Sequence, residues 1–159
     1  MEEKPYRDLN GYYRSLFGCK IAKIALDGGF TCPNRDGTCG TRGCLFCSAG
    51  GSGDFAENAA LSIAQQIEKG RAQTAKKWAD VKYIAYFQAF TNTYAPVAVL
   101  RQKFEEALAQ PEIVGLSIAT RADCLPQDVI DLLKELSQKT KIWVEIGFQT
   151  ANEQTAKII

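Results

Sequence analysis

Histidine is absent from this chain of 159 residues. The absence excludes histidine general bases, histidine metal ligands and every nucleophile that depends on a serine–histidine or cysteine–histidine pair. No Walker or dinucleotide-binding fingerprint is present either. Any catalysis or metal binding must therefore rely on other residue types.

The sequence also lacks a surplus of charge and a long apolar run. Lys and Arg total 19 against 18 Asp and Glu, a formal net charge of +1, so no long-range field attracts nucleic acid or an anionic membrane. The charged start, residues 1–7, has no apolar signal-peptide segment, and no stretch reaches the roughly 18 apolar residues that span a bilayer. These absences predict a cytoplasmic protein without membrane contact.

Cysteine is abundant by contrast, with six residues. Four of them fall within 16 residues: Cys32, Cys39, Cys44 and Cys47. In a reducing compartment such a group indicates a metal site rather than disulfides. The spacing leaves open a structural zinc held by four thiolates and an iron–sulfur cluster. Cys19 and Cys124 are expected to be small buried hydrophobic residues.

Apolar segments and turn residues alternate along the chain. After a lead-in over residues 1–19, strands are predicted at 20–26, 81–88, 113–120 and 141–148, and a Gly-rich cysteine loop occupies 27–53. The helices are predicted over 59–76 with Asn58 as cap, from Pro96 to before Pro111, from Pro126, and after a cap at Asn152. This alternation predicts an α/β fold with parallel strands, either a (β/α) barrel or a doubly wound sheet.

Four strand–helix units make half of an eight-unit barrel, which takes about 250 residues. Residues 1–159 are therefore expected to form one incomplete domain, the N-terminal half of a TIM-like barrel, apparently truncated inside its last helix. If no residues follow, the fourth strand is an unpaired edge, which invites pairing between chains.

Alternate residues of a barrel strand face the covering helices and the interior. One set of alternate residues is apolar and is predicted to face the helices. It includes Ile24, Leu26, Val114, Leu116, Ile118, Ile142, Val144, Ile146 and Phe148. The other set is more polar, and Gln88, Arg121, Glu145 and Gln149 fall near strand C-terminal ends, the rim where ligand sites gather. The alternative is that these residues are solvated, or that Glu145 and Arg121 form a structural ion pair.

A [4Fe–4S] cluster held by three thiolates leaves one iron open to chelate S-adenosylmethionine (SAM). The cysteine loop, with C-P-N-R-D-G at 32–37 and G-C-L-F-C-S at 43–48, resembles that of an uncharacterised radical SAM family, the YtqA/YhcC type, which is similar to the elongator catalytic subunit. The resemblance extends over most of the chain, through L-D-G-G-F at 26–30, F-Q-A-F-T-N-T-Y at 87–94, T-R-A-D-C at 120–124 and E-I-G-F-Q-T at 145–150. It departs at Ala122, where the family's proline is expected.

The resemblance implies a radical SAM enzyme with a TIM-like barrel. The implied cluster ligands are Cys32, Cys44 and Cys47, with Cys39 left out although its spacing is closer to the common C-x3-C-x2-C motif. The residues implied to contact SAM are Phe46, the segment after the second strand including Gln88, and Arg121, Glu145 and Gln149. Arg35 and Lys23 are candidates to neutralise negative charge, and no catalytic residue is assigned.

The function expected from this resemblance is reductive cleavage of SAM to a 5′-deoxyadenosyl radical that abstracts a substrate hydrogen. The implied partners are an electron donor such as flavodoxin or ferredoxin and, by similarity to the elongator subunit, a tRNA substrate. The alternatives are a zinc-stabilised binding module with four cysteine ligands, and an electron-transfer protein that holds the cluster with Cys39 as fourth ligand.

Overall fold

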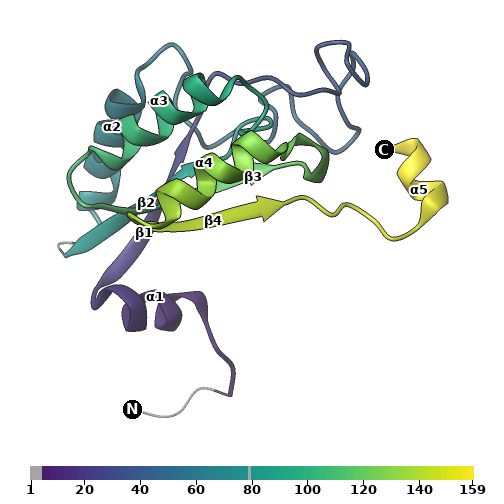
Figure 1. Ribbon diagram of the computed structural model, residues 1–159. Helices are drawn as coiled ribbons and strands as arrows, with labels where there is room; N and C mark the ends of the chain where they lie inside the picture. Colours follow the sequence, from purple (N-terminus) through teal and green to yellow (C-terminus); the bar gives the residue numbers. More distant parts are fainter. Residues whose placement is uncertain (1–4, 79) are drawn as a thin grey trace.

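The computed structural model describes residues 5–78 and 80–159 and has an α/β fold with one four-stranded parallel sheet (Figure 1). The strands are β1 (Lys20–Leu26), β2 (Val81–Phe87), β3 (Ile113–Thr120) and β4 (Lys141–Ile146), and they lie in sequence order. The helices are α1 (Leu9–Phe17), α2 (Ile63–Ala75), α3 (Val97–Leu108), α4 (Gln127–Ser137) and α5 (Glu153–Ile158), with a 3-10 turn at Ala122–Cys124. The four predicted strands are confirmed, although β2 and β4 end one and two residues earlier than expected.

Helices α2, α3 and α4 cover one face of the sheet, as each connection between successive strands requires (Figure 1). The core of this layer is apolar, and at its centre the rings of Phe87 on β2 and Phe104 on α3 meet edge to face at 5.0 Å. Ile24, Leu26, Leu116, Ile118 and Ile142 point into it as predicted.

Helix α1 covers the other face and was not predicted from the sequence. Asp8 caps its first turn and Gly18, with a φ of 74°, ends it. Tyr13 packs edge to face on Trp143 of β4, with ring centroids 5.6 Å apart. The N-terminal end of the inner sheet face is therefore closed by aromatic residues.

The start of α2 differs from the prediction. The helix begins at Ile63 rather than at residue 59, because Ser62 and Gln65 form a capping box in which each side chain accepts a hydrogen bond from the other residue's backbone. Asn58, the predicted cap, instead accepts a hydrogen bond from the backbone of Ala60 in a turn before the helix. The predicted starts of α3 and α4 also shift by one residue. Pro96 and Pro126 were expected to be the first helical residues, and they are the N-cap residues instead.

The predicted orientation of Val114 is wrong, because β3 contains a β-bulge at this residue. Tyr83 pairs with Ile113 and Ile84 pairs with Gly115, so Val114 is an extra residue between two paired positions. Val114 consequently packs with Tyr13, Ile21 and Ile84 on the inner face, and not under the helices.

The inner face is concave. Lys23 on β1 forms an ion pair with Glu145 on β4, although two strands lie between them. In a flat sheet three inter-strand gaps would separate these strands by about 14 Å, too far for two side chains that stand perpendicular to the sheet. The ion pair therefore depends on a sheet that curls toward this face.

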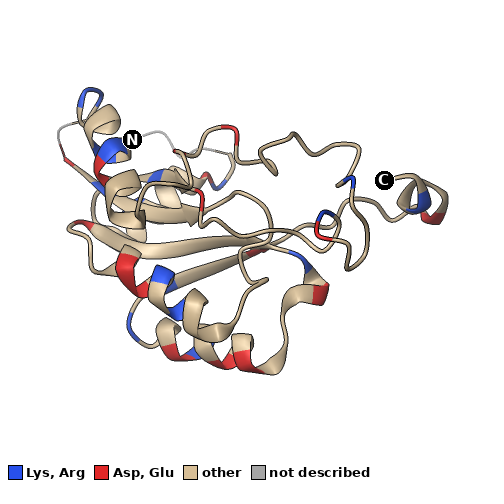
Figure 2. Cartoon of the chain, turned by 90° about the horizontal axis from the view of Figure 1, so that it is seen from above, with Lys and Arg blue, Asp and Glu red and all other residues tan. Residues whose placement is uncertain are grey.

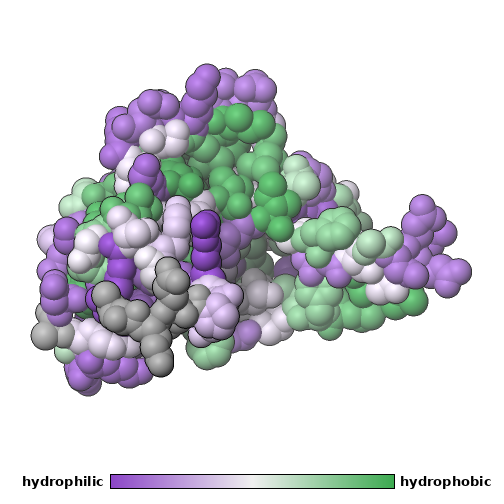
Figure 3. Space-filling view, turned by 90° about the horizontal axis from the view of Figure 1, so that it is seen from below, coloured by the Kyte–Doolittle hydropathy of each residue, from purple (hydrophilic) through white to green (hydrophobic). Residues whose placement is uncertain are grey.

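Basic and acidic residues are interspersed along the helices (Figure 2). Strand β4 pairs only with β3 among the described strands, and Val144 and Ile146, which were predicted to lie under helices, are exposed. Seen from below, apolar side chains reach the surface beside polar ones (Figure 3). Helix α5 lies beyond the C-terminal end of β4 (Figure 1). Within residues 5–78 and 80–159, no helix has the length and apolarity to cross a membrane.

Candidate functional site

The cysteine loop is a chain of tight turns. The carbonyl oxygen of Cys32 accepts a hydrogen bond from the backbone of Arg35 at 2.8 Å, and that of Cys44 accepts one from Cys47 at 3.0 Å. Pro33 accepts two more, from Cys39 and Gly40. These turns explain why a stretch without regular secondary structure holds a defined shape.

Arg35 ties the two halves of the loop together. Its guanidinium donates hydrogen bonds to the backbone oxygens of Ser48 and Ala49, the latter at 3.3 Å. It also lies 5.4 Å from the centre of the Phe90 ring, just after β2. Arg35 also lines the cavity described below, so its expected role in neutralising carboxylate or cluster charge stays a prediction.

Two glycines attach the loop to the end of β2. The backbone of Phe90 donates a hydrogen bond to Gly51 at 2.8 Å, and Gly51 has a φ of 62° with the Phe90 ring where a Cβ would lie. A Cβ on Gly53 would come within 2.5 Å of the Ala89 side chain. A residue with a side chain at either position would push the loop off the sheet.

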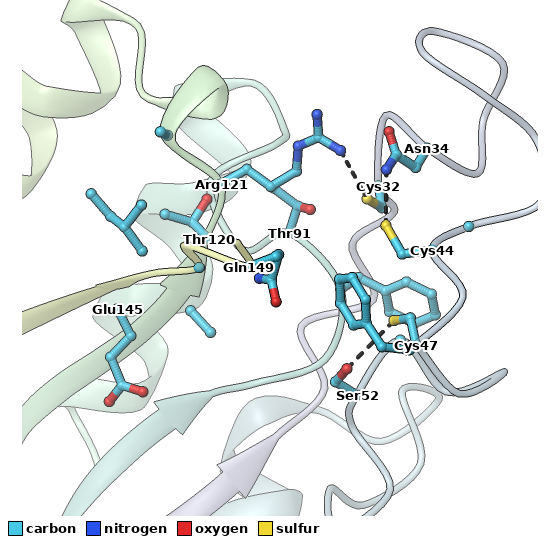
Figure 4. Close-up of a pocket in the computed structure, with 18 of the residues that line it drawn as sticks. Cys32, Asn34, Cys44, Cys47, Ser52, Thr91, Thr120, Arg121, Glu145 and Gln149 are labelled. Atoms are coloured by element: carbon cyan, nitrogen blue, oxygen red, sulfur yellow. Dashed lines mark hydrogen bonds between the residues drawn. The ribbon is translucent and has the colours of Figure 1, made fainter. Parts of the chain in front are cut away.

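The loop, the strand ends and the C-terminal segment around α5 line an open cavity of about 730 Å³. All the residues that the sequence assigned to a cluster or to SAM line this cavity: Cys32, Cys44, Phe46, Cys47, Gln88, Arg121, Glu145 and Gln149. In Figure 4 the three cysteines lie on the side of the loop, Arg121 and Gln149 face them, and Glu145 lies farther along the sheet. The sequence thus correctly placed these residues at one rim.

Each cysteine sulfur in the cavity has a different polar neighbour. Asn34 donates a hydrogen bond to Cys44 at 3.0 Å, Ser52 lies 3.4 Å from Cys47, and the Arg121 guanidinium is 4.0 Å from Cys32 (Figure 4). Hydrogen-bond donors beside sulfur stabilise thiolates and iron–sulfur ligands. No three His, Cys, Asp or Glu side chains in the described part of the chain are grouped tightly enough to hold one metal ion.

The Arg121 side chain is oriented by Asp123, which the sequence did not single out. Nε and Nη2 of Arg121 donate to the two carboxylate oxygens of Asp123 at 2.8 and 2.6 Å, so that Nη1 is the nitrogen that faces Cys32. Hydrogen bonds from Arg121 hold the pKa of Asp123 below its ordinary value, even though partial burial opposes this. The alternative ion pair between Arg121 and Glu145 does not form.

Glu145 binds Lys23 and Ser117 instead. Its Oε1 atom accepts hydrogen bonds from both, and Lys23 also donates to the Ser117 hydroxyl at 3.2 Å. Partial burial raises the pKa of Glu145, but the hydrogen bonds from Lys23 and Ser117 and the charge of Lys23 outweigh it, so the pKa lies below its ordinary value. Glu145 is therefore an ionised carboxylate at neutral pH.

Tyr86 completes this end of the cavity. Burial, and then the negative charge of Glu145 and a hydrogen bond with it, raise the pKa of Tyr86 to about 12. The phenol therefore stays protonated and available as a hydrogen-bond donor. The sequence missed Tyr86 because apolar residues occupy both faces of β2, so that the strand could not be oriented from its pattern.

Cys39 lies outside this cavity. It lines a second cavity of about 540 Å³ with Pro33, Tyr94 and Cys124, on another side of the loop. Cys124 is buried as predicted, and burial followed by the charge of Asp123 raises the pKa of its thiol to about 11. Cys19 packs against the cluster around Tyr13 but is only half-buried, so the prediction of a buried residue is confirmed for Cys124 and only in part for Cys19.

No family model matches the chain, and no solved structure matches it. The chain is 58% identical over 157 residues to the uncharacterised protein YtqA of Bacillus subtilis, covering 99% of this chain and 49% of the relative. It is 45% identical over 142 residues to protein YhcC of Escherichia coli K12 (87% of this chain, 44% of the relative) and 34% identical over 151 residues to the uncharacterised protein MJ0486 of Methanocaldococcus jannaschii (93% and 45%). The chain thus spans about half the length of these relatives, and their names state no activity, cofactor or substrate.

Proposed function

We propose that this chain is the N-terminal half of a radical SAM barrel domain and holds a [4Fe–4S] cluster through Cys32, Cys44 and Cys47. The observation that carries the proposal is that one cavity at the strand C-terminal ends is lined by these three thiols and by no other cysteine. Three thiolates are the number that leaves one iron free for a small-molecule ligand. The chemistry that such a cluster supplies when bound is reductive cleavage of SAM to a 5′-deoxyadenosyl radical.

The protein's own residues fit this donor set. Arg121 directs a positive nitrogen toward Cys32, and Asn34 donates to Cys44, so that negative charge on the sulfurs is stabilised. A four-iron cluster is wider than one ion, so its ligands lie farther apart than those of a zinc site. All three thiols line one cavity of about 730 Å³, which has room for the wider group.

The remaining assigned residues form a wall on which SAM would be oriented. Phe46 offers an apolar ring and Gln88 and Gln149 offer amides. Glu145 offers an ionised carboxylate that accepts hydrogen bonds from hydroxyl or amino groups. These residues would orient the bound molecule. The aromatic cluster of Tyr13, Phe17 and Trp143 keeps water from the N-terminal end of the inner sheet face.

The zinc-stabilised binding module and the four-thiolate electron carrier both need Cys39 as a ligand. Cys39 lines a different cavity from the other three cysteines of the loop. The arrangement therefore favours three ligands over four. The whole enzyme would also require an electron donor such as flavodoxin or ferredoxin and a substrate, for which we propose tRNA on the resemblance to the elongator catalytic subunit.

The test is anaerobic iron–sulfur reconstitution followed by EPR of the dithionite-reduced protein with and without SAM. A reduced [4Fe–4S] signal that changes when SAM is added is the expected result. Bound zinc without a reconstitutable cluster, both in this chain and in a full-length relative, would overturn the proposal. A cluster whose signal ignores SAM would favour the electron carrier.

A further inference from the structure

Four polar side chains, one from each strand, meet on the concave face beyond the thiol end of the cavity. They are Lys23 on β1, Tyr86 on β2, Ser117 on β3 and Glu145 on β4. Tyr86 and Glu145 line the cavity, whereas Lys23 contacts both of them without being among the lining residues. Polar groups that converge from four elements are costly to keep in an apolar layer unless they satisfy one another, as these do.

Lys23 is the centre of this group. Its ammonium binds Glu145 Oε1, donates to the Ser117 hydroxyl at 3.2 Å, and lies 4.3 Å from the centre of the Tyr86 ring. The Lys23 and Glu145 side chains retain 31% and 40% of their accessible surface. Both side chains are therefore partly hydrated. The ion pair contributes little to the free energy of unfolding, and its main effect is to orient the Glu145 carboxylate.

The other titratable groups that face Glu145 cannot replace Lys23. Tyr86 on β2 and Tyr13 on α1 are phenols whose pKa values burial and the charge of Glu145 raise, and Ser117 on β3 is neutral. Lys23 on β1 is thus the cation that compensates the carboxylate.

We propose that Lys23 is a positioning residue of the site: with Ser117 it fixes one oxygen of the Glu145 carboxylate and keeps the carboxylate ionised at the cavity wall, next to the Tyr86 hydroxyl. The functional consequence rests on the proposed function, in which Glu145 contacts SAM. Without the ammonium, the partly buried carboxylate between two phenols takes up a proton at higher pH and is free to turn toward solvent. Lys23 itself does not touch the ligand and acts through Glu145.

The first arm of the test needs no cofactor. The chain is labelled with ¹³C at glutamate carboxyl carbons, Glu145→Gln assigns the Glu145 signal, and its titration is compared in wild type, Lys23→Met, Lys23→Arg and Lys20→Met. Lys20 is the matched control because it lies on the same strand, also over an aromatic ring, at 4.6 Å from the centre of Trp78. The expected result is a Glu145 titration displaced to higher pH in Lys23→Met, largely restored in Lys23→Arg and unchanged in Lys20→Met.

The second arm measures SAM affinity on the reconstituted protein by EPR titration. We expect Lys23→Met to weaken binding about fivefold near neutral pH and more strongly as pH falls, because protonation of Glu145 then competes. In a Glu145→Gln background, Lys23→Met should add no further loss and no pH dependence. Circular dichroism of each variant checks that the fold is kept.

An unchanged Glu145 titration in Lys23→Met overturns the proposal whatever the cluster does, and so does a SAM-binding loss that persists without Glu145. If neither the wild-type chain nor a full-length relative takes up a cluster, the proposed function is overturned instead, and the Glu145 titration still decides the role of Lys23.

Discussion

Cys32 and Cys39 lie seven residues apart in one loop, yet they line different cavities. The backbone of Cys39 folds back onto Pro33, with a hydrogen bond of 2.7 Å, and this turn directs the two side chains apart. Cys39 is exposed and Cys32 is half-buried beside Arg121.

Substitution of single cysteines should therefore distinguish the cluster ligands of the loop from Cys39, which is not a ligand in this proposal. We expect Cys32→Ala, Cys44→Ala and Cys47→Ala to lose most of the iron and sulfide taken up on reconstitution, because two thiolates hold a cluster poorly. Cys39→Ala should retain the wild-type content. Iron and sulfide analysis with the visible absorption spectrum measures this, and a chain that tolerates Cys32→Ala but not Cys39→Ala would refute the assignment.

The capping box of α2 can be tested on stability. Ser62→Ala removes the acceptor for the backbone of Gln65, and we expect the free energy of unfolding to fall by about 1 kcal/mol in urea titrations. Asn58→Ala is the control, since Asn58 caps a turn outside the helix, and should cost clearly less. Equal losses would mean that the helix starts earlier than the structure places it.

Gly70 on α2 allows the helix to approach β1. Alanine in a helix is favoured over glycine by about 1 kcal/mol, but a Cβ on Gly70 would lie 2.4 Å from Cγ2 of Ile24. Because overpacking typically costs about 1–3 kcal/mol, we expect Gly70→Ala to destabilise the chain. In an Ile24→Ala background the same change should stabilise it, and urea denaturation of the four proteins measures both effects.

Tyr86 should make stability depend on pH in the alkaline range. Its pKa is about 12 in the folded chain against 10.0 for the ordinary group, so the folded state holds the phenolic proton more tightly. The contribution is complete below pH 10, falls as the unfolded chain loses its proton, and is gone near pH 12. Tyr86→Phe should show a smaller decline between pH 10 and 12 in denaturation curves, and a decline equal to that of wild type would contradict the raised pKa.

Much of this architecture follows from local patterns that the sequence displays. The alternation of Leu116 and Ile118 with Ser117, and of Ile142 with Trp143 and Glu145, distinguishes the face of β3 and β4 that lies under α2, α3 and α4 from the face that carries α1 and the cavity. The polar residues at strand ends and the position of the cysteine loop after β1 are enough to predict a site at one rim. The choice among the cysteines came from the family resemblance.

The features that the sequence did not disclose depend on contacts between distant segments. Val114 follows the apolar pattern of its strand. Only the pairing of β3 with β2 shows that Val114 is an extra residue, whose side chain faces the side opposite α2, α3 and α4. Helix α1 owes its position to Tyr13 stacking on Trp143, 130 residues later. The partners of Arg121 and Glu145 likewise depend on which charged groups the folded sheet brings within reach.

The packing of Trp143 gives the molecule a built-in optical reporter. The chain has two tryptophans, and Trp78 is 41% exposed on the surface, while Trp143 lies on the inner face of β4 two residues before Glu145. A Trp78→Phe variant would thus emit from one indole, on the same sheet face as Glu145 of the cavity wall. Energy transfer from that indole to a coloured iron–sulfur chromophore would quench the emission as the site fills, so assembly could be followed in real time without any label.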